Sequence, residues 1–156
     1  MKRSNGAFLA GVVLLLTTTQ AYAGQLAIGS ANVQPGQTVS VPITYTAEGK
    51  TAVAVASDIR FNTTIFKNPR CENGSALGSD KSVRCGTPKP GILRLAVFGL
   101  NTNPVAVGEV AKIVFDVAAG AKPGRYTLRH KPTAADKDGN DFKLVHSHGV
   151  IRVVKN

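Results

Sequence analysis

Apolar and polar residues alternate with a period of two along most of the chain. In residues 39–45, with the sequence VSVPITY, every second side chain is apolar. Successive side chains of a β-strand point to opposite faces, so this pattern places one face in a core and the other toward solvent. The same alternation predicts further strands at 53–61, 93–97, 111–117, 126–130 and 151–153.

Short turn-forming segments separate these alternating runs. They are Pro35-Gly36, Glu48-Gly49, Pro90-Gly91, Pro123-Gly124 and Asp138-Gly139-Asn140. No stretch has a convincing period of 3.6, and we find no internal repeat. Many short strands at this spacing are typical of an antiparallel β-sandwich or a jelly roll. The sequence therefore predicts an all-β fold.

Residues 97–117, VFGLNTNPVAVGEVAKIVFDV, predict a strand, a polar break and a second strand. We interpret them as a hairpin. The break contains no acid pair, no nucleophile and no phosphate-binding glycine loop.

The first 23 residues have the pattern of an export signal. Lys2 and Arg3 precede an apolar run at 8–16, and Ala21-Tyr22-Ala23 supplies small residues for a signal peptidase. The run is shorter than the roughly 20 residues of a membrane-spanning helix. We expect cleavage after Ala23, a single domain over 24–156, and a secreted product in the extracellular space or the periplasm.

The chain is basic, with a formal charge of +10 that falls to +8 when Lys2 and Arg3 are removed. A positive charge favours anionic partners such as acidic glycans, surface polymers or nucleic acid. The cations are scattered rather than clustered, which favours a role in solubility. Tyr and Phe are few and fall mostly at core-like positions, so nucleic acid is disfavoured.

Two cysteines, Cys71 and Cys85, lie in the part expected to be exported. The polar stretch between them makes a disulfide the simplest interpretation, worth about 3 kcal/mol through the unfolded chain. A catalytic redox pair would favour C-x-x-C spacing, which is absent.

Two short motifs raise the question of metal binding. Oxygen-bearing side chains alternate in DKDGND, and they are Asp136, Asp138, Asn140 and Asp141. A helix–loop–helix calcium site also needs a downstream Glu and flanking helices, so a hairpin turn at Asp-Gly is favoured. On a strand, the side chains of His146 and His148 would point to the same side, as the ligands of an H-x-H metal site do. His130 is a candidate third ligand of the metal. A turn before the last strand is the simpler interpretation, and no cofactor is predicted.

Catalytic groups are sparse. The only glutamates are Glu48, Glu72 and Glu109, and no motif places a carboxylate pair for glycoside hydrolysis. No nucleophile elbow supports a Ser-His-Asp set. There is no Trp, and only Phe98 and Phe142 are expected near the surface, so an aromatic strip for stacking sugars is disfavoured. We predict that the chain is not an enzyme.

The order of the motifs resembles the cohesin domain over residues 25–154. The resemblance rests on VQPGQTVSVPITYT, then GEVAKIVFDV, then PGRYTL, and finally DKDGN followed by GVIRV. It implies a nine-stranded jelly roll, related in fold to carbohydrate-binding modules. It also implies a non-enzymatic module that holds a dockerin-like protein partner in a polysaccharide-degradation or cell-surface setting.

In cellulosomal cohesins, the strand matching 54–61 carries polar residues that help to fix the dockerin. The resemblance therefore suggests a partner-binding sheet face, with two asparagines at the rim of the hairpin. Its candidate residues are Asp58, Arg60, Arg94, Phe98, Lys112, Asn101 and Asn103. Two alternatives remain open at this stage: an ordinary solvated face, and a carbohydrate-binding module that recognises a polysaccharide through charge and hydrogen bonds.

Overall fold

The computed structural model describes residues 24–155, which form twelve strands and no helix. The strands are β1 (Gln25–Ile28), β2 (Ser30–Val33), β3 (Thr38–Thr46), β4 (Ala54–Arg60), β5 (Phe66–Asn73), β6 (Ser82–Lys89), β7 (Ile92–Phe98), β8 (Gly108–Val117), β9 (Gly124–Ala135), β10 (Asp141–Lys143), β11 (Val145–Ser147) and β12 (Gly149–Val153). The expected signal segment, residues 1–23, lies outside the described residues. Within the described part, no helix is long and apolar enough to cross a membrane.

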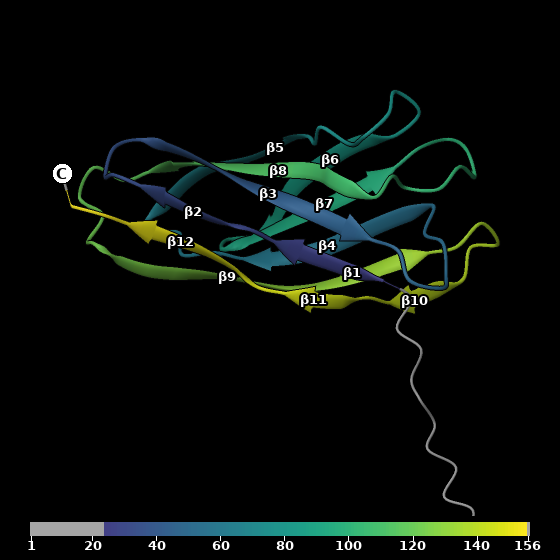
Figure 1. Ribbon diagram of the computed structural model, residues 1–156. Helices are drawn as coiled ribbons and strands as arrows, with labels where there is room; N and C mark the ends of the chain where they lie inside the picture. The colour runs from purple at the N-terminus through teal and green to yellow at the C-terminus, as the bar shows by residue number, and fades with distance from the viewer. Residues whose placement is uncertain (1–23, 156) are drawn as a thin grey trace, which may run out of the picture.

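The strands form two sheets packed face to face (Figure 1). One sheet has the order β11-β1-β3-β8-β5, and the other has the order β2-β12-β9-β4-β7-β6, with β10 paired to β9. The all-β sandwich expected from the alternation is confirmed. The number of strands exceeds the nine implied by the resemblance, partly because the first and last segments of the sandwich are each divided between the two sheets.

The terminal strands depart from the expected antiparallel pairing. β1 pairs with β11, and β2 pairs with β12, in parallel register. The chain changes sheets at Gly29 and again between β11 and β12, so the first and last segments run side by side in the same direction (Figure 1). Gly149 makes this crossing possible, because a Cβ there would meet Ile28 Cγ2 at 2.3 Å.

The predicted hairpin at 97–117 is wrong. Its two strands exist, but β7 pairs with β4 and β6 in one sheet, while β8 pairs with β3 and β5 in the other. The polar break is therefore a crossover between sheets. Within it, Val105 is buried and its N–H donates to the carbonyl of Ala52 at 2.8 Å. Alternation identifies strands but cannot tell which neighbour completes their hydrogen bonds.

The predicted alternation places the core correctly. Ile43, Tyr45, Ile113 and Phe115 are completely buried between the sheets. The ring of Phe115 lies 5.3 Å from that of Phe66, measured between centroids. One continuous apolar cluster thus joins both sheets and fixes which side chains face outward.

The predicted disulfide between Cys71 and Cys85 is confirmed. Cys71 lies on β5 and Cys85 on β6, which are edge strands of different sheets. The bond therefore joins the two layers at one margin of the sandwich.

Lys81 differs from the other cations, which the sequence suggested were scattered over the surface. Its side chain is only 2% exposed, and its Nζ donates to the carbonyl of Val53 at 3.0 Å and to Asn101 Oδ1 at 2.8 Å. These two hydrogen bonds connect Lys81, which lies just before β6, to the segment that leads into β4 and to the β7–β8 crossover. Lys81 is thus a structural residue.

Candidate functional site

Four adjacent strands, β9, β4, β7 and β6, present an open outer face, which we call the basic face. The strand register fixes its rows. Asp58 lies opposite Arg94 on one side and Lys131 on the other, and Ala56 lies opposite Ala96 and Thr133. The outward side chains that define this face are Ala54, Ala56, Asp58, Arg60, Arg84, Arg94, Ala96, Arg129, Lys131 and Thr133.

The only acidic side chain in this set, Asp58, is already paired. Arg94 donates from Nε to Asp58 Oδ1 at 2.7 Å and from a terminal nitrogen to Oδ2 at 2.8 Å. These charge-assisted bonds lower the pKa of the Asp58 carboxyl below its usual value and raise that of Arg94. Asp58 is therefore held ionised and oriented on the face.

The other cations of the basic face are not held by a carboxylate in the described residues, although Lys131 lies directly opposite Asp58. Arg60, Arg84, Arg129 and Lys131 are all exposed and form no salt bridge there. Arg60 lies directly opposite Arg129 in the register of β4 and β9. Like charges opposite one another on neighbouring strands repel, so this row favours an external anion.

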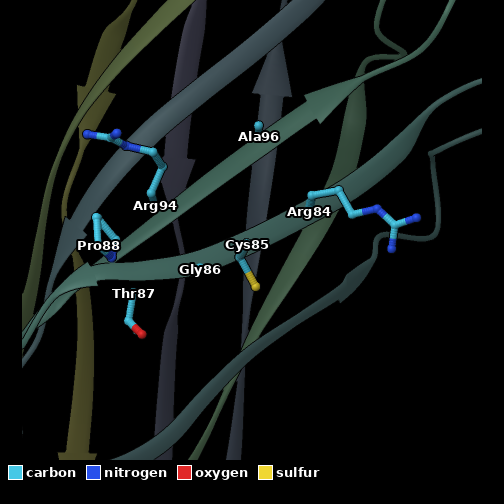
Figure 2. A pocket seen from close by; sticks show the side chains of 7 residues that line it. All are labelled: Arg84, Cys85, Gly86, Thr87, Pro88, Arg94 and Ala96. Atoms are coloured by element: carbon cyan, nitrogen blue, oxygen red, sulfur yellow. The ribbon is translucent and has the colours of Figure 1, made fainter.

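Small side chains in the middle of the basic face leave a shallow hollow there. Ala54, Ala56 and Ala96 line one hollow together with Thr133 and Phe98. A neighbouring hollow of about 460 Å³ is lined by Arg84, Arg94 and Ala96 among others. In Figure 2, the two arginines of this hollow extend in different directions on either side of Ala96. A partner can thus approach the alanine floor while meeting cations at its margin.

The outer face of the other sheet has a different electrostatic character. On it, Arg70 is 3.1 Å from Asp116, and Lys112 is 3.6 Å from Glu109. Hydrogen bonds from Asn68 and Arg70 lower the pKa of the Asp116 carboxyl. We call this surface of β3, β8 and β5 the paired face, because its charges neutralise one another.

The structure divides the predicted partner-binding residues between these two faces. Asp58, Arg60 and Arg94 come together on the basic face, whereas Lys112 lies on β8 of the paired face. The expectation that all four share one face is wrong, because β7 and β8 belong to different sheets. Whether any of these residues binds a partner stays a prediction.

The two predicted asparagines are engaged inside the protein. Asn101 accepts a hydrogen bond from Lys81 and donates to the carbonyl of Asp80 at 2.8 Å. Asn103 donates from Nδ2 to Asp80 Oδ2 at 2.9 Å. Both side chains thus fix the β7–β8 crossover against the segment before β6.

Phe98 fits the expectation of a surface aromatic. It is 39% exposed at the end of β7, beside the alanine floor. The next apolar side chain, Leu100, is fully exposed on the crossover. Phe142 is half-buried and packs against the core, with Lys50 Nζ 5.5 Å from the centre of its ring. The described residues therefore present no row of exposed aromatic rings.

The calcium alternative at DKDGND does not gain support. Asp136 Oδ1 accepts the backbone N–H groups of Asp138 and Asn140, at 3.0 and 2.9 Å. These bonds build the turn of the β9–β10 hairpin and lower the pKa of Asp136. The favoured hairpin turn is confirmed. In the described part of the chain, no group of three His, Cys, Asp or Glu side chains is arranged to hold a metal ion.

The three histidines do come together, with ring centroids 5.2 to 5.8 Å apart. His130 is buried beside Ser57, whose hydroxyl lies 3.0 Å from Nδ1, and its Nε2 lies 3.0 Å from the carbonyl of Ser147. The pKa of His130 is lowered to about 4, chiefly by burial and to a smaller extent by the nearby His146 and His148. Since Ser57 and His130 are only 3% and 5% exposed, a substrate cannot reach this Ser–His pair.

Sequence interpretation missed the contribution of β9 to the basic face. Arg129 is one of the cations interpreted as scattered, and Lys131 is not singled out, although Arg125, Arg129 and Lys131 share one phase of the alternation at 125–131. That shared phase was the available signal. It did not reveal which strand lies next to β9, and the pairing of β9 with β4 decides that these cations meet Asp58 and Arg60.

Comparison with known proteins gives one family match. The model of the family described as "Cohesin domain" matches residues 24–153 of the chain. No protein of curated function matches.

Several solved structures share the fold. CaCohA2 from Clostridium acetobutylicum matches with a TM-score of 0.72 and 24% identity over 86% of this chain and 92% of that one. A type I cohesin–dockerin complex from Clostridium thermocellum gives 0.72 and 17%, over 85% and 99%. A non-cellulosomal cohesin from the archaeon Archaeoglobus fulgidus gives 0.65 and 16%, over 84% and 91%.

Proposed function

The chain belongs to the cohesin domain family, and from this premise we propose that it is an exported, non-catalytic module that docks a dockerin-like protein. The proposed setting is polysaccharide degradation or a cell surface. The basic face formed by β9, β4, β7 and β6 is the proposed docking surface.

The observation that carries this proposal is the contrast between the two outer faces. The basic face has a floor of small side chains and exposed cations that form no salt bridge in the described residues, whereas the paired face neutralises its charges internally. A protein interface needs a surface that a partner can approach closely and groups that gain partners on binding. Only the basic face offers both among the described residues.

Similar structures support a protein partner rather than a substrate. One of the solved structures with this fold is a cohesin bound to a dockerin. In this chain, the Ser57–His130 pair is buried, which argues against catalysis by this pair. Export is proposed from the leader-like residues 1–23 and agrees with the disulfide between Cys71 and Cys85.

Binding of the chain to a panel of purified dockerin modules tests this function. Ala56→Tyr fills the floor of the basic face without adding charge, and we expect it to abolish binding to any dockerin that the unmodified chain captures. Ser40→Tyr is the matched control, because Ser40 is exposed on β3 of the paired face. This variant should bind as the unmodified chain does.

Two results would reject the proposal. The first is that no dockerin in the panel binds, while insoluble polysaccharides retain the chain by themselves, as expected of a carbohydrate-binding module. The second is that Ser40→Tyr abolishes dockerin binding and Ala56→Tyr does not. Circular dichroism of both variants establishes that each remains folded.

A further inference from the structure

The charges of the basic face carry an inference about the partner, which rests on the proposed docking function. Five cations flank the alanine floor on the basic face, and one carboxylate, Asp58, lies among them. A second carboxylate, Asp141, lines the floor itself. The cations are Arg60, Arg84, Arg94, Arg129 and Lys131. Arg94 holds both carboxylate oxygens of Asp58, and the remaining four cations form no salt bridge in the described residues.

Two of these cations are placed where they repel each other. Arg60 and Arg129 are direct neighbours across β4 and β9, and both line a hollow with Lys131, His148 and the carboxylate Asp58, which Arg94 already holds. Like charges opposite one another destabilise a sheet, and solvent and salt screen this repulsion only in part. A bound carboxylate between them would remove the repulsion and gain charge-assisted hydrogen bonds, since a guanidinium matches a carboxylate in geometry.

We propose that the basic face binds an acidic protein surface, with partner carboxylates at the Arg60–Arg129 row and at Lys131. Small apolar side chains of the partner pack on the floor formed by Ala54, Ala56 and Ala96. On these strands the Ala56–Ala96–Thr133 row of the floor is followed by the Asp58–Arg94–Lys131 row and then by the Arg60–Arg129 row. A partner must therefore carry apolar and acidic groups near each other. This arrangement sets the orientation of the partner as well as its charge.

The floor favours a protein over an acidic polysaccharide. Uronic acids would satisfy the cations, but they have little apolar surface to place on three alanines and Phe98. Sugar rings stack on exposed aromatics, and Phe98 is the one large aromatic side chain exposed in the described part of the chain. The basic face also lacks the row of aromatic side chains on which the bases of a nucleic acid would stack.

Three synthetic peptides test the inference. They have the same length and the same Ala and Leu content, and their remaining positions are all Glu, all Gln or all Lys. We expect the chain to bind the Glu peptide at least about tenfold more tightly than the Gln peptide and to reject the Lys peptide. Added NaCl should weaken the binding of the Glu peptide, because exposed charges are screened.

Matched variants locate this effect. The double variant Arg60→Gln, Lys131→Gln should lose most of the preference for the Glu peptide, whereas Lys112→Gln on the paired face should keep it. Equal binding of all three peptides, or loss of the preference in Lys112→Gln alone, would overturn the inference. Polygalacturonate that competes as effectively as the Glu peptide would assign the face to an acidic glycan and would also overturn it.

The two proposals can fail separately. If Ala56→Tyr abolishes dockerin binding but Arg60→Gln, Lys131→Gln leaves it unchanged, docking on this face stands and the acidic partner is wrong. If the peptides show the expected preference but no dockerin binds, the chemistry of the face stands and the dockerin-like partner is wrong.

Discussion

The hydroxyl of Ser57 and Nδ1 of His130 lie 3.0 Å apart in the core, between β4 and β9. The Nε2 of the same ring lies 3.0 Å from the carbonyl oxygen of Ser147, which can only accept. Nε2 must therefore carry the proton, and Nδ1 accepts from the Ser57 hydroxyl. The fold thus selects a neutral imidazole of one tautomer.

This selection makes stability depend on pH. The pKa of His130 is lowered from 6.5 to about 4, chiefly because burial disfavours the charged ring. Below pH 6.5 the unfolded chain takes up a proton that the folded chain does not. Stability is therefore complete above about pH 6.5 and falls as the pH drops toward 4, by up to about 3 kcal/mol. Urea unfolding across this range measures the effect.

Two variants test the assignment to His130. His130→Gln removes the titrating group, so its free energy of unfolding should change less between pH 7 and 4. Ser57→Ala removes the hydroxyl donor but keeps the ring, so it should lower stability by about 1–3 kcal/mol at neutral pH and retain the pH dependence. Parallel pH profiles for the unmodified chain and His130→Gln would contradict this account.

The inter-sheet disulfide should contribute measurably to stability. The double variant Cys71→Ser, Cys85→Ser frees the edge strands β5 and β6, and we expect a loss of about 3 kcal/mol from the loop that the bond closes. Thermal unfolding of the variant measures this loss, and the unmodified chain with reductant should approach the same melting temperature. Alkylation of unreduced, correctly exported protein should find no free thiol. Two alkylated cysteines would reject the bond.

Inward and outward positions should differ sharply in their tolerance to change. Ile113 is fully buried on β8, so Ile113→Ala should cost roughly 2–5 kcal/mol. Arg60 is exposed and forms no salt bridge among residues 24–155, so Arg60→Glu should change the free energy of unfolding by less than about 0.5 kcal/mol. Chemical denaturation of the two variants measures the difference. A large loss in Arg60→Glu would show that β4 is shifted by one residue.

The crossing of the terminal strands should depend on Gly149. A methyl group there would lie 2.3 Å from Ile28 Cγ2 and 2.7 Å from the carbonyl of Gly29, so Gly149→Ala should cost about 1–3 kcal/mol. Gly120→Ala is the matched control, because nothing lies within 4 Å of its added methyl group. Thermal unfolding of both variants checks this. Equal melting temperatures would mean that the terminal strands pack less closely than described.

The local pattern of the sequence was enough to predict the strands and their inward faces. Side chains alternate with a period of two on any strand. The buried positions in residues 39–45 and 111–117 can therefore be predicted without knowing which strands lie next to them. The same holds for the Asp-Gly turn, where the stabilising hydrogen bonds of Asp136 lie within four residues. The disulfide followed from there being only two cysteines.

Tertiary structure alone decided which strands are neighbours, and through them the candidate site. Strand pairing is set by contacts between residues far apart in the chain, so VFGLNTNPVAVGEVAKIVFDV looked like a hairpin although its strands belong to different sheets. For the same reason Lys112 does not lie on the face for which it was predicted, whereas Arg129 and Lys131 do lie there. The burial of Lys81 could not be predicted either, because its partners Val53 and Asn101 come from other segments of the chain. For His130 the alternation predicted the inward position, but not the partners Ser57 and Ser147.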